Sequence, residues 1–166
     1  MSQIHKFLFD GLPLKGAIVR LDDCWQEVLR RRGGNSHTGP WPQPVAELLG
    51  QMLAAGCLMQ AGIKFNGALV LQMQSTGPVQ LAVAEIQNDF ALRATATVQA
   101  DADLPAGAHL GDLLPQGQCA VTLDPRDRLP GQQPYQGVVA LQNAQGQDLP
   151  TLAQALTGYM LHSEQL

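Results

Sequence analysis

Three short segments of β-prone residues follow one another closely in the middle of the chain, at 68–74, 80–86 and 92–99. The turns that join them contain only Ser75 to Pro78 and Gln87 to Asp89. Turns this short leave an antiparallel meander as the simplest way to pair the three segments. The third segment alternates apolar and polar residues, so one face of the predicted sheet is packed and the other is wetter.

The strongest helical pattern in the chain comes directly before these strands. It opens with Pro44, whose missing N–H does no harm in the first turn, and apolar residues recur at spacings of three and four as far as Ile63. Small residues interrupt the pattern and would let another backbone approach closely. We therefore predict a central, buried helix, and we expect Asn66-Gly67 to leave it through a left-handed conformation.

The rest of the chain supplies further elements of both types. We predict strands at 5–9, 17–21, 118–123 and 135–141, helices at 22–33 and 149–162, a helical turn at 110–114, and an exposed loop at 33–42. Asp22 or Asp23 is expected to cap the first of these helices, and Asp148 the last. The expected fold is a single α+β domain over residues 1–166, with antiparallel sheet packed with helices.

Composition excludes several classes of partner. The formal net charge is −4, which offers no basic surface for nucleic acid or for an anionic membrane. The longest apolar-biased run, 45–63, is broken by polar residues and glycines, and the N-terminus lacks the pattern of a signal peptide. We therefore expect a cytoplasmic protein. Only 14% of residues are charged, against about 25% in an average soluble domain, so the surface is weakly protected against association.

Residues that carry catalysis or bind metals are few and scattered. The candidates are Cys24, Cys57, Cys119, His5, His37, His109 and His162. No two of them fall at the spacing of metal ligands, and no Gly-Lys-Ser or Gly-Lys-Thr is present for a phosphate. Cys24 stands at a helix start, where the helix dipole would lower a thiol pKa, but its context is that of an ordinary helical cysteine. The three cysteines are expected to be reduced thiols.

Several segments, taken in order, resemble the family of the redox-regulated thirty-three-kilodalton heat-shock protein. They are His5-Lys6-Phe7-Leu8-Phe9 with Lys15-Gly16, Pro42-Gln43-Pro44-Val45 through Glu47-Leu48-Leu49, Ile63-Lys64-Phe65-Asn66-Gly67, Thr76-Gly77-Pro78-Val79, Tyr135-Gln136-Gly137-Val138-Val139, and Ser163-Glu164-Gln165-Leu166. The order and spacing of these segments make the match specific, and it covers nearly the whole chain.

The chain departs from the family pattern in a few places. Asn66 stands where the family usually has Asp, His162 stands where it often has Arg, and the loop 33–40 resembles an insertion. Family members also continue with further core strands, a linker and a C-terminal zinc domain bearing Cys-x-Cys and Cys-x-x-Cys. The resemblance therefore implies an N-terminal, substrate-binding core without the zinc redox switch, and no cofactor is expected in this chain.

The resemblance implies an ATP-independent holdase, not an enzyme, that binds unfolding proteins under heat and oxidative stress. We also predict a homodimer, because the absence of the following strands would leave a sheet edge uncovered. The expected contacts to client proteins are apolar side chains on two strands and on the last helix. They are Leu69, Leu71, Met73, Leu81, Val83, Leu152, Leu156 and Met160.

Two alternatives to the holdase remain open from the sequence. One is a protein-interaction domain of the same fold that binds a single partner and protects no unrelated protein. The other is a hydrolase or thiol enzyme, which requires a His or Asp within hydrogen-bond reach of a Cys sulfur or Ser oxygen.

Overall fold

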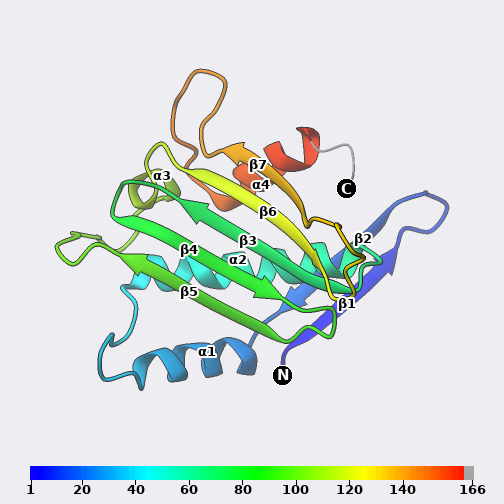
Figure 1. Cartoon of the computed structure of the whole chain (residues 1–166), viewed down its shortest axis with the longest axis horizontal. Helices are drawn as coiled ribbons and strands as arrows, with labels where there is room; N and C mark the ends of the chain where they lie inside the picture. Colours follow the sequence, from blue (N-terminus) through cyan, green and yellow to red (C-terminus); the bar gives the residue numbers. More distant parts are fainter. Residues whose placement is uncertain (163–166) are drawn as a thin grey trace.

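A five-stranded antiparallel sheet organises the chain in this computed structural model, which describes residues 1–162. Its strands are β3 (Gly67–Gln74), β4 (Val79–Ile86), β5 (Leu92–Val98), β6 (Gln118–Pro125) and β7 (Tyr135–Ala140), in the spatial order β5-β4-β3-β6-β7 (Figure 1). The predicted meander of β3, β4 and β5 is confirmed. After β5 the chain makes a long connection, passes β4 and adds β6 to the free side of β3.

A separate hairpin and four helices complete the described part of the chain. The hairpin pairs β1 (Gln3–Leu8) with β2 (Lys15–Arg20), and the helices are α1 (Asp23–Gly33), α2 (Gln43–Gly62), α3 (Leu110–Leu113) and α4 (Leu152–His162). α2 crosses behind the sheet in Figure 1, and α4 packs beside it against β7. Both helices therefore cover the same face of the sheet, which confirms the expected α+β class.

The core lies between α2 and this face of the sheet, as expected for the glycine-rich central helix. Leu49, Met52 and Leu53 of α2 are fully buried. A Cβ at Gly56 would stand 2.2 Å from Cδ1 of Ile86 on β4, so the absence of a side chain lets the helix approach the strand closely.

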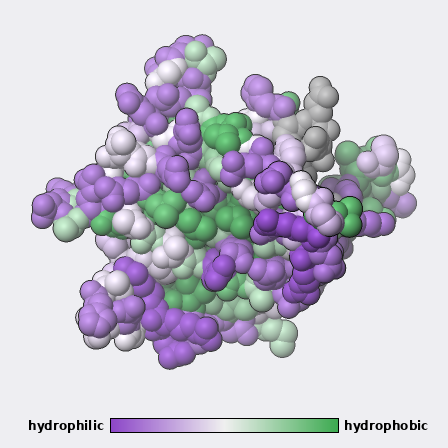
Figure 2. Space-filling model, viewed as in Figure 1, coloured by the Kyte–Doolittle hydropathy of each residue, from purple (hydrophilic) through white to green (hydrophobic). Residues whose placement is uncertain are grey.

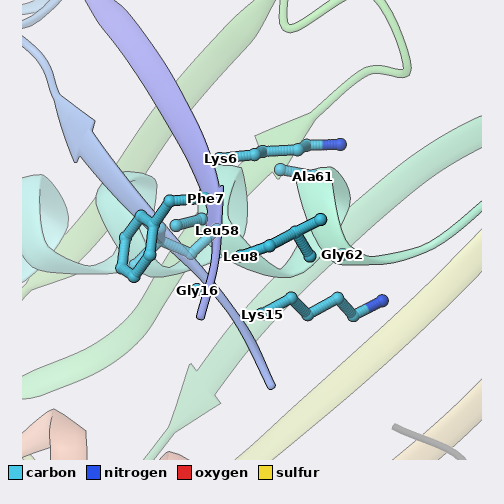
Figure 3. A pocket seen from close by; sticks show the side chains of 9 residues that line it. Lys6, Phe7, Leu8, Lys15, Gly16, Leu58, Ala61 and Gly62 are labelled. Carbon is cyan, nitrogen blue, oxygen red and sulfur yellow. The ribbon is translucent and has the colours of Figure 1, made fainter. Parts of the chain in front are cut away.

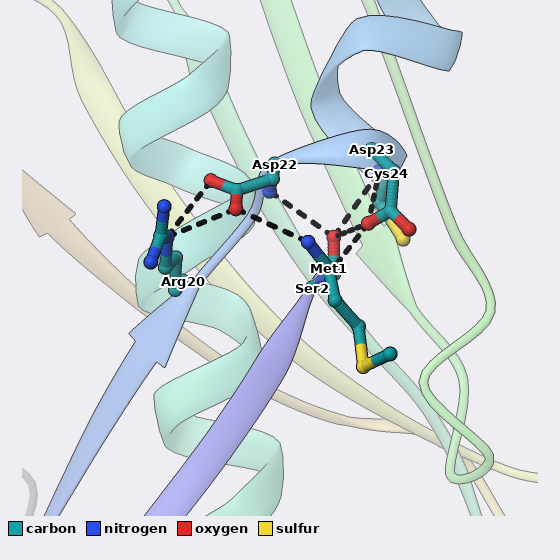
Figure 4. Close-up of polar contacts among 6 residues, drawn as sticks. All are labelled: Met1, Ser2, Arg20, Asp22, Asp23 and Cys24. Carbon is teal, nitrogen blue, oxygen red and sulfur yellow. Dashed lines mark hydrogen bonds and ion pairs between the residues drawn. The ribbon is translucent and has the colours of Figure 1, made fainter.

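Polar contacts of the N-terminus tie the hairpin to the start of α1 (Figure 4). The Ser2 hydroxyl oxygen accepts hydrogen bonds from the backbone N–H groups of Asp22 and Cys24, each at 3.1 Å, and Ser2 also donates to Asp23. Asp22 instead binds Arg20 and the N-terminal amine. The hydrogen bond from Arg20 lowers the pKa of Asp22, and those from Ser2 lower the pKa of Asp23. Of the two expected caps, Asp22 is wrong, since its side chain accepts no N–H of the first turn, whereas Asp23 accepts the Cys24 N–H at 3.1 Å and shares it with Ser2.

The exit from α2 also differs from the expectation. The helix ends at Gly62 with Ile63 extended, and neither Asn66 nor Gly67 has a positive φ. Gly67 is needed for a different reason: a Cβ there would lie 2.1 Å from the backbone oxygen of Asp124 on β6. The glycine therefore permits a close strand contact and does not make a turn.

The last helix begins three residues later than predicted. α4 starts at Leu152, and the hydroxyl oxygen of Thr151 accepts a hydrogen bond from the N–H of Gln154 at 3.2 Å. Asp148 does not cap it, because its Oδ1 accepts the N–H of Gln116 at 2.9 Å. Pro150 lies between Asp148 and the helix, and the residue before a proline is disfavoured in helical conformation.

The three cysteines are free and occupy two different environments. Cys24 is exposed on α1, whereas Cys57 and Cys119 are buried in the core. Burial away from water raises the pKa of Cys57 to about 11 and that of Cys119 to about 12. The two buried thiols are therefore held in the unreactive, protonated form.

Replacing Gly67 by Ala should destabilise the protein by about 1–3 kcal/mol, because the new methyl group meets a backbone oxygen that cannot move aside cheaply. Gly158→Ala is the matched control. Nothing lies within 4 Å of a Cβ at this helical position, so alanine should stabilise α4 by about 0.5–1 kcal/mol. Urea unfolding of both variants measures the difference. Equal effects at the two positions would contradict the close β3–β6 approach.

Cys24 should be the one thiol of the folded protein that reacts quickly with an aromatic disulfide reagent at pH 8. Cys57 and Cys119 should react only as fast as the protein opens, because both are buried and protonated. Absorbance of the released thiolate counts the reacting groups, and guanidinium should expose all three. The Cys24→Ser variant keeps only Cys57 and Cys119, so a rapid reaction of this variant with the reagent would contradict the burial of these two thiols.

Candidate functional site

The face of the five-stranded sheet opposite α2 is covered by no helix among the described residues. Strand register places Val83, Gln72, Ala120 and Val138 side by side in one row across β4, β3, β6 and β7. Val70 and Leu81 lie in the flanking rows, next to Gln72 and Val83. We call Val70, Leu81, Val83, Ala120 and Val138 the open face. Figure 2 shows hydrophobic side chains along the middle of this side of the molecule, with hydrophilic ones around them.

Two polar pairs lie in the row of Val70, beside the row that contains Val83 and Val138. Arg93 of β5 forms an ion pair with Glu85 of β4 at 2.6 Å, and the Gln136 amide donates to the Thr122 hydroxyl oxygen at 3.1 Å. Val138 is 55% exposed, while the other members of the open face are half-buried. An apolar strip with a polar border is typical of a surface that contacts another chain.

The predicted contacts on β3 are wrong, since they lie on the other face of the sheet. Leu69, Leu71 and Met73 have no exposed surface and pack against α2. Side chains alternate along a strand, so these three belong to the core once α2 covers their face. Side chains without exposed surface cannot touch another protein in this fold.

The other predicted residues are divided between two places. Leu81 and Val83 lie on the open face. Leu152 is buried at 4% exposure, Leu156 is half-buried, and Met160 is 39% exposed, all three on α4. A Cβ at Gly137 of β7 would stand 2.8 Å from the Tyr159 ring, so α4 packs on the face of the sheet opposite Leu81 and Val83. The predicted set therefore does not form one site, and Leu152 is a packing residue.

A second apolar surface, on the β1–β2 hairpin, was not predicted. Its exposed large side chains are Phe7, Leu8, Phe9, Leu12, Leu14 and Ile18. We call these residues the hairpin surface. The rings of Phe7 and Phe9 meet edge to face, with centroids 5.5 Å apart. The signal was present in the sequence, because the run Phe7-Leu8-Phe9 places large apolar groups on both faces of a strand.

The hairpin surface borders a hollow of about 750 Å³ at the C-terminal end of α2. Figure 3 shows Leu8 between Lys6 and Lys15, with Ala61 and Gly62 of α2 behind them. Among the described residues neither lysine forms an ion pair. The hollow combines apolar walls with two cationic groups at its margin.

Within residues 1–162 the structure gathers no group of three His, Cys, Asp or Glu side chains that could hold a metal ion. The zinc that the family resemblance implies thus finds no ligand set in this part of the chain. Among the described residues no Cys or Ser side chain hydrogen-bonds a histidine. The Ser2 hydroxyl does donate to Asp23, but the same oxygen accepts the N–H groups of Asp22 and Cys24, so this contact holds the N-terminus against the start of α1. None of the helices described is long and apolar enough to cross a membrane.

Comparison with known proteins identifies the relatives of this chain. The family model described as Hsp33 protein matches residues 2–166. A 33 kDa chaperonin of Chromobacterium violaceum is 44% identical over 166 residues, 99% of this chain and 50% of the relative. One of Methylobacillus flagellatus is 38% identical over the same share of each chain. The chain therefore spans about half the length of the curated relatives it matches.

A solved structure supports the fold. The crystal structure of a 33 kDa chaperonin from Thermotoga maritima aligns with a TM-score of 0.72 at 19% sequence identity, covering 98% of this chain and 51% of that chain. At this identity the likeness shows the fold alone. The match of the family model over nearly all residues, together with relatives above 30% identity, shows that the chain belongs to the Hsp33 family.

Proposed function

We propose that this chain binds unfolding proteins and prevents their aggregation, without ATP, through the open face. The observation that carries the proposal is the group of apolar side chains on β4, β3, β6 and β7, interrupted by Gln72 and left uncovered by the described residues, in a member of a family whose relatives are named chaperonins. Unfolded segments expose apolar side chains, and their burial against such a strip is favourable by about 25 cal/mol per Å². No chemical step is needed, so the proposed role is that of a holdase and not of an enzyme.

The proposed binding mode uses only side chains that are exposed or half-buried. Leu81, Val83 and Val138 provide the strip, and we keep Leu156 and Met160 of α4 as a smaller, separate contact. The net charge of −4 favours protein clients over nucleic acid or anionic membranes. Apolar contacts without a shaped pocket discriminate weakly between segments, which suits a protein that meets many clients.

We further propose that residues 1–166 correspond to the N-terminal, substrate-binding core of a cytoplasmic stress protein. Regulation by zinc and oxidation, which the resemblance implies, is assigned to the part of the relatives that this chain does not match. Cys24, Cys57 and Cys119 receive no role in that switch, because the three are dispersed between an exposed helix and a buried core.

Replacing Val138 by Asp should weaken protection of a thermally unfolding client about tenfold, because a charge is placed in the apolar strip. The exposed position predicts a change in stability within about 0.5 kcal/mol. Light scattering of the client, with the chain added under reducing conditions and without ATP, measures protection. Leu129→Asp, in an exposed loop, is the matched control and should protect like the unmodified protein.

Failure of the unmodified, folded chain to protect unrelated clients would contradict the holdase. It would favour the alternative of an interaction domain that binds one partner.

The hairpin surface supports a homodimer, which we propose as the solution state. Leu8 is 82% exposed and Leu12 57%, and a second copy would remove both from water. Light scattering behind a sizing column should give twice the chain mass at micromolar concentration, and Leu8→Glu should return the mass to that of one chain. A monomeric mass for the unmodified protein across the micromolar range would refute the dimer.

A further inference from the structure

A groove of about 410 Å³ runs between α1 and the outer edge of the five-stranded sheet. One wall is α1 and the other is β5 with the turn before it. The lining residues are Cys24, Val28, Arg31 and Arg32 of α1, Trp41 before α2, and 90–95. The groove is remote from the centre of the open face, since β5 is the last strand on its side of the sheet.

The backbone of β5 faces this groove with unpaired groups. The Gln99 N–H donates to the Pro78 oxygen at 2.9 Å, and the Ala91 oxygen accepts from the Gln87 N–H at 2.8 Å, so odd-numbered residues turn toward β4. Peptide groups alternate in direction along an extended strand. Ala94 and the other even-numbered residues therefore direct N–H and C=O outward, where the described chain provides no partner strand.

Two buried side-chain donors in the groove lack an acceptor. Trp41 is 9% exposed, and its Nε1 has no hydrogen-bond partner among the described residues. The buried Nε of Arg32 is likewise unpaired, and its guanidinium lies over the Trp41 ring, 5.0 Å from the centroid. Buried donors without acceptors are rare and costly, so an acceptor oxygen beside this wall of the groove would be favourable.

The charge around these donors favours a negative ligand. Glu27 binds both Arg30 and Arg31, each at 2.7 Å, and these two contacts lower the pKa of Glu27 to about 2. Glu27 thus pairs with two of the three consecutive arginines, and Arg32 is left without an ion pair among residues 1–162. Arg93 on the opposite wall is already paired with Glu85. The groove therefore carries a positive charge in a chain of net charge −4.

We propose that this groove binds an extended peptide segment with an acidic side chain, added to β5 as a sixth strand. The outward N–H and C=O groups of Ala94 pair with the peptide backbone, and the peptide carboxylate pairs with the guanidinium of Arg32, beside Trp41. The inference rests on the proposed function for the source of the peptide, which is an unfolding protein. It adds a second site whose preference depends on charge and on backbone pairing.

The two tryptophans make this binding visible. Trp25 packs against Gly50 of α2, outside the groove, so Trp25→Phe leaves Trp41 as the one tryptophan of the chain. In this background, a short labelled peptide of alternating Val and Thr with a central Glu is titrated into the protein. Binding is followed both by Trp41 fluorescence and by anisotropy of the label.

We expect the Glu peptide to change Trp41 fluorescence, and a Gln or Lys peptide to bind about tenfold more weakly or less. Arg32→Gln should weaken binding of the Glu peptide about tenfold. Arg30→Gln is the matched control, because it removes a neighbouring charge on α1 that does not line the groove. Ala94→Pro removes one outward N–H without breaking the β4 ladder and should abolish binding.

Two peptides, one methylated on the odd-numbered and one on the even-numbered backbone nitrogens, test the same pairing without changing the protein. One of the two should not bind, because its methyl groups replace the N–H groups that face β5. Binding that leaves Trp41 unchanged, or that both the methylated peptides and Ala94→Pro retain, would overturn the added strand. Acetate alone changing Trp41 as strongly as the peptide would also overturn it, since an isolated anion would then suffice.

The same samples separate this inference from the holdase. If the chain protects clients but the Glu peptide leaves Trp41 fluorescence unchanged, the proposal for the groove fails and the holdase proposal stands. If the Glu peptide changes Trp41 fluorescence but the chain does not protect clients, peptide binding in the groove is supported and the holdase proposal fails.

Discussion

The packing of α2 against one face of the five-stranded sheet is the interaction on which the rest of the structure depends. Gly56 brings the helix within contact of Ile86, and the side chains of β3 that point toward it become fully buried. Because side chains alternate along a strand, this packing also decides which residues remain on the opposite face. The open face is thus a direct consequence of where one helix lies.

The molecule offers three surfaces of different chemistry around this core. The open face is an apolar strip with polar borders, and its proposed contacts depend on hydrophobic burial alone. The hairpin surface carries larger and more exposed side chains, such as Leu8. The groove at β5 adds buried donors at Arg32 and Trp41 beside the unpaired backbone groups of an edge strand. The two proposed kinds of contact, apolar at the open face and charge-dependent in the groove, therefore lie at separate places on one chain.

Local sequence information was sufficient for most elements but not for their ends. The meander of β3, β4 and β5 and the central helix α2 follow from turn residues and apolar spacing, which act within a few residues. The cap of α1 comes from Ser2, some twenty residues away, and Gly67 is required by contact with Asp124. Neither requirement can be deduced from neighbouring residues, because both arise where distant segments meet.

The sequence by itself determined the α+β class, the antiparallel meander, the buried central helix and the resemblance to the Hsp33 family, since each depends on local pattern or on the order of motifs. Tertiary structure decided which apolar side chains are available to a partner. Leu71 and Val83 are equally apolar strand residues, yet one is buried beneath α2 and the other lies on the open face. The physical reason is that exposure depends on what covers a face, and the covering helix is separate from the strand that it covers.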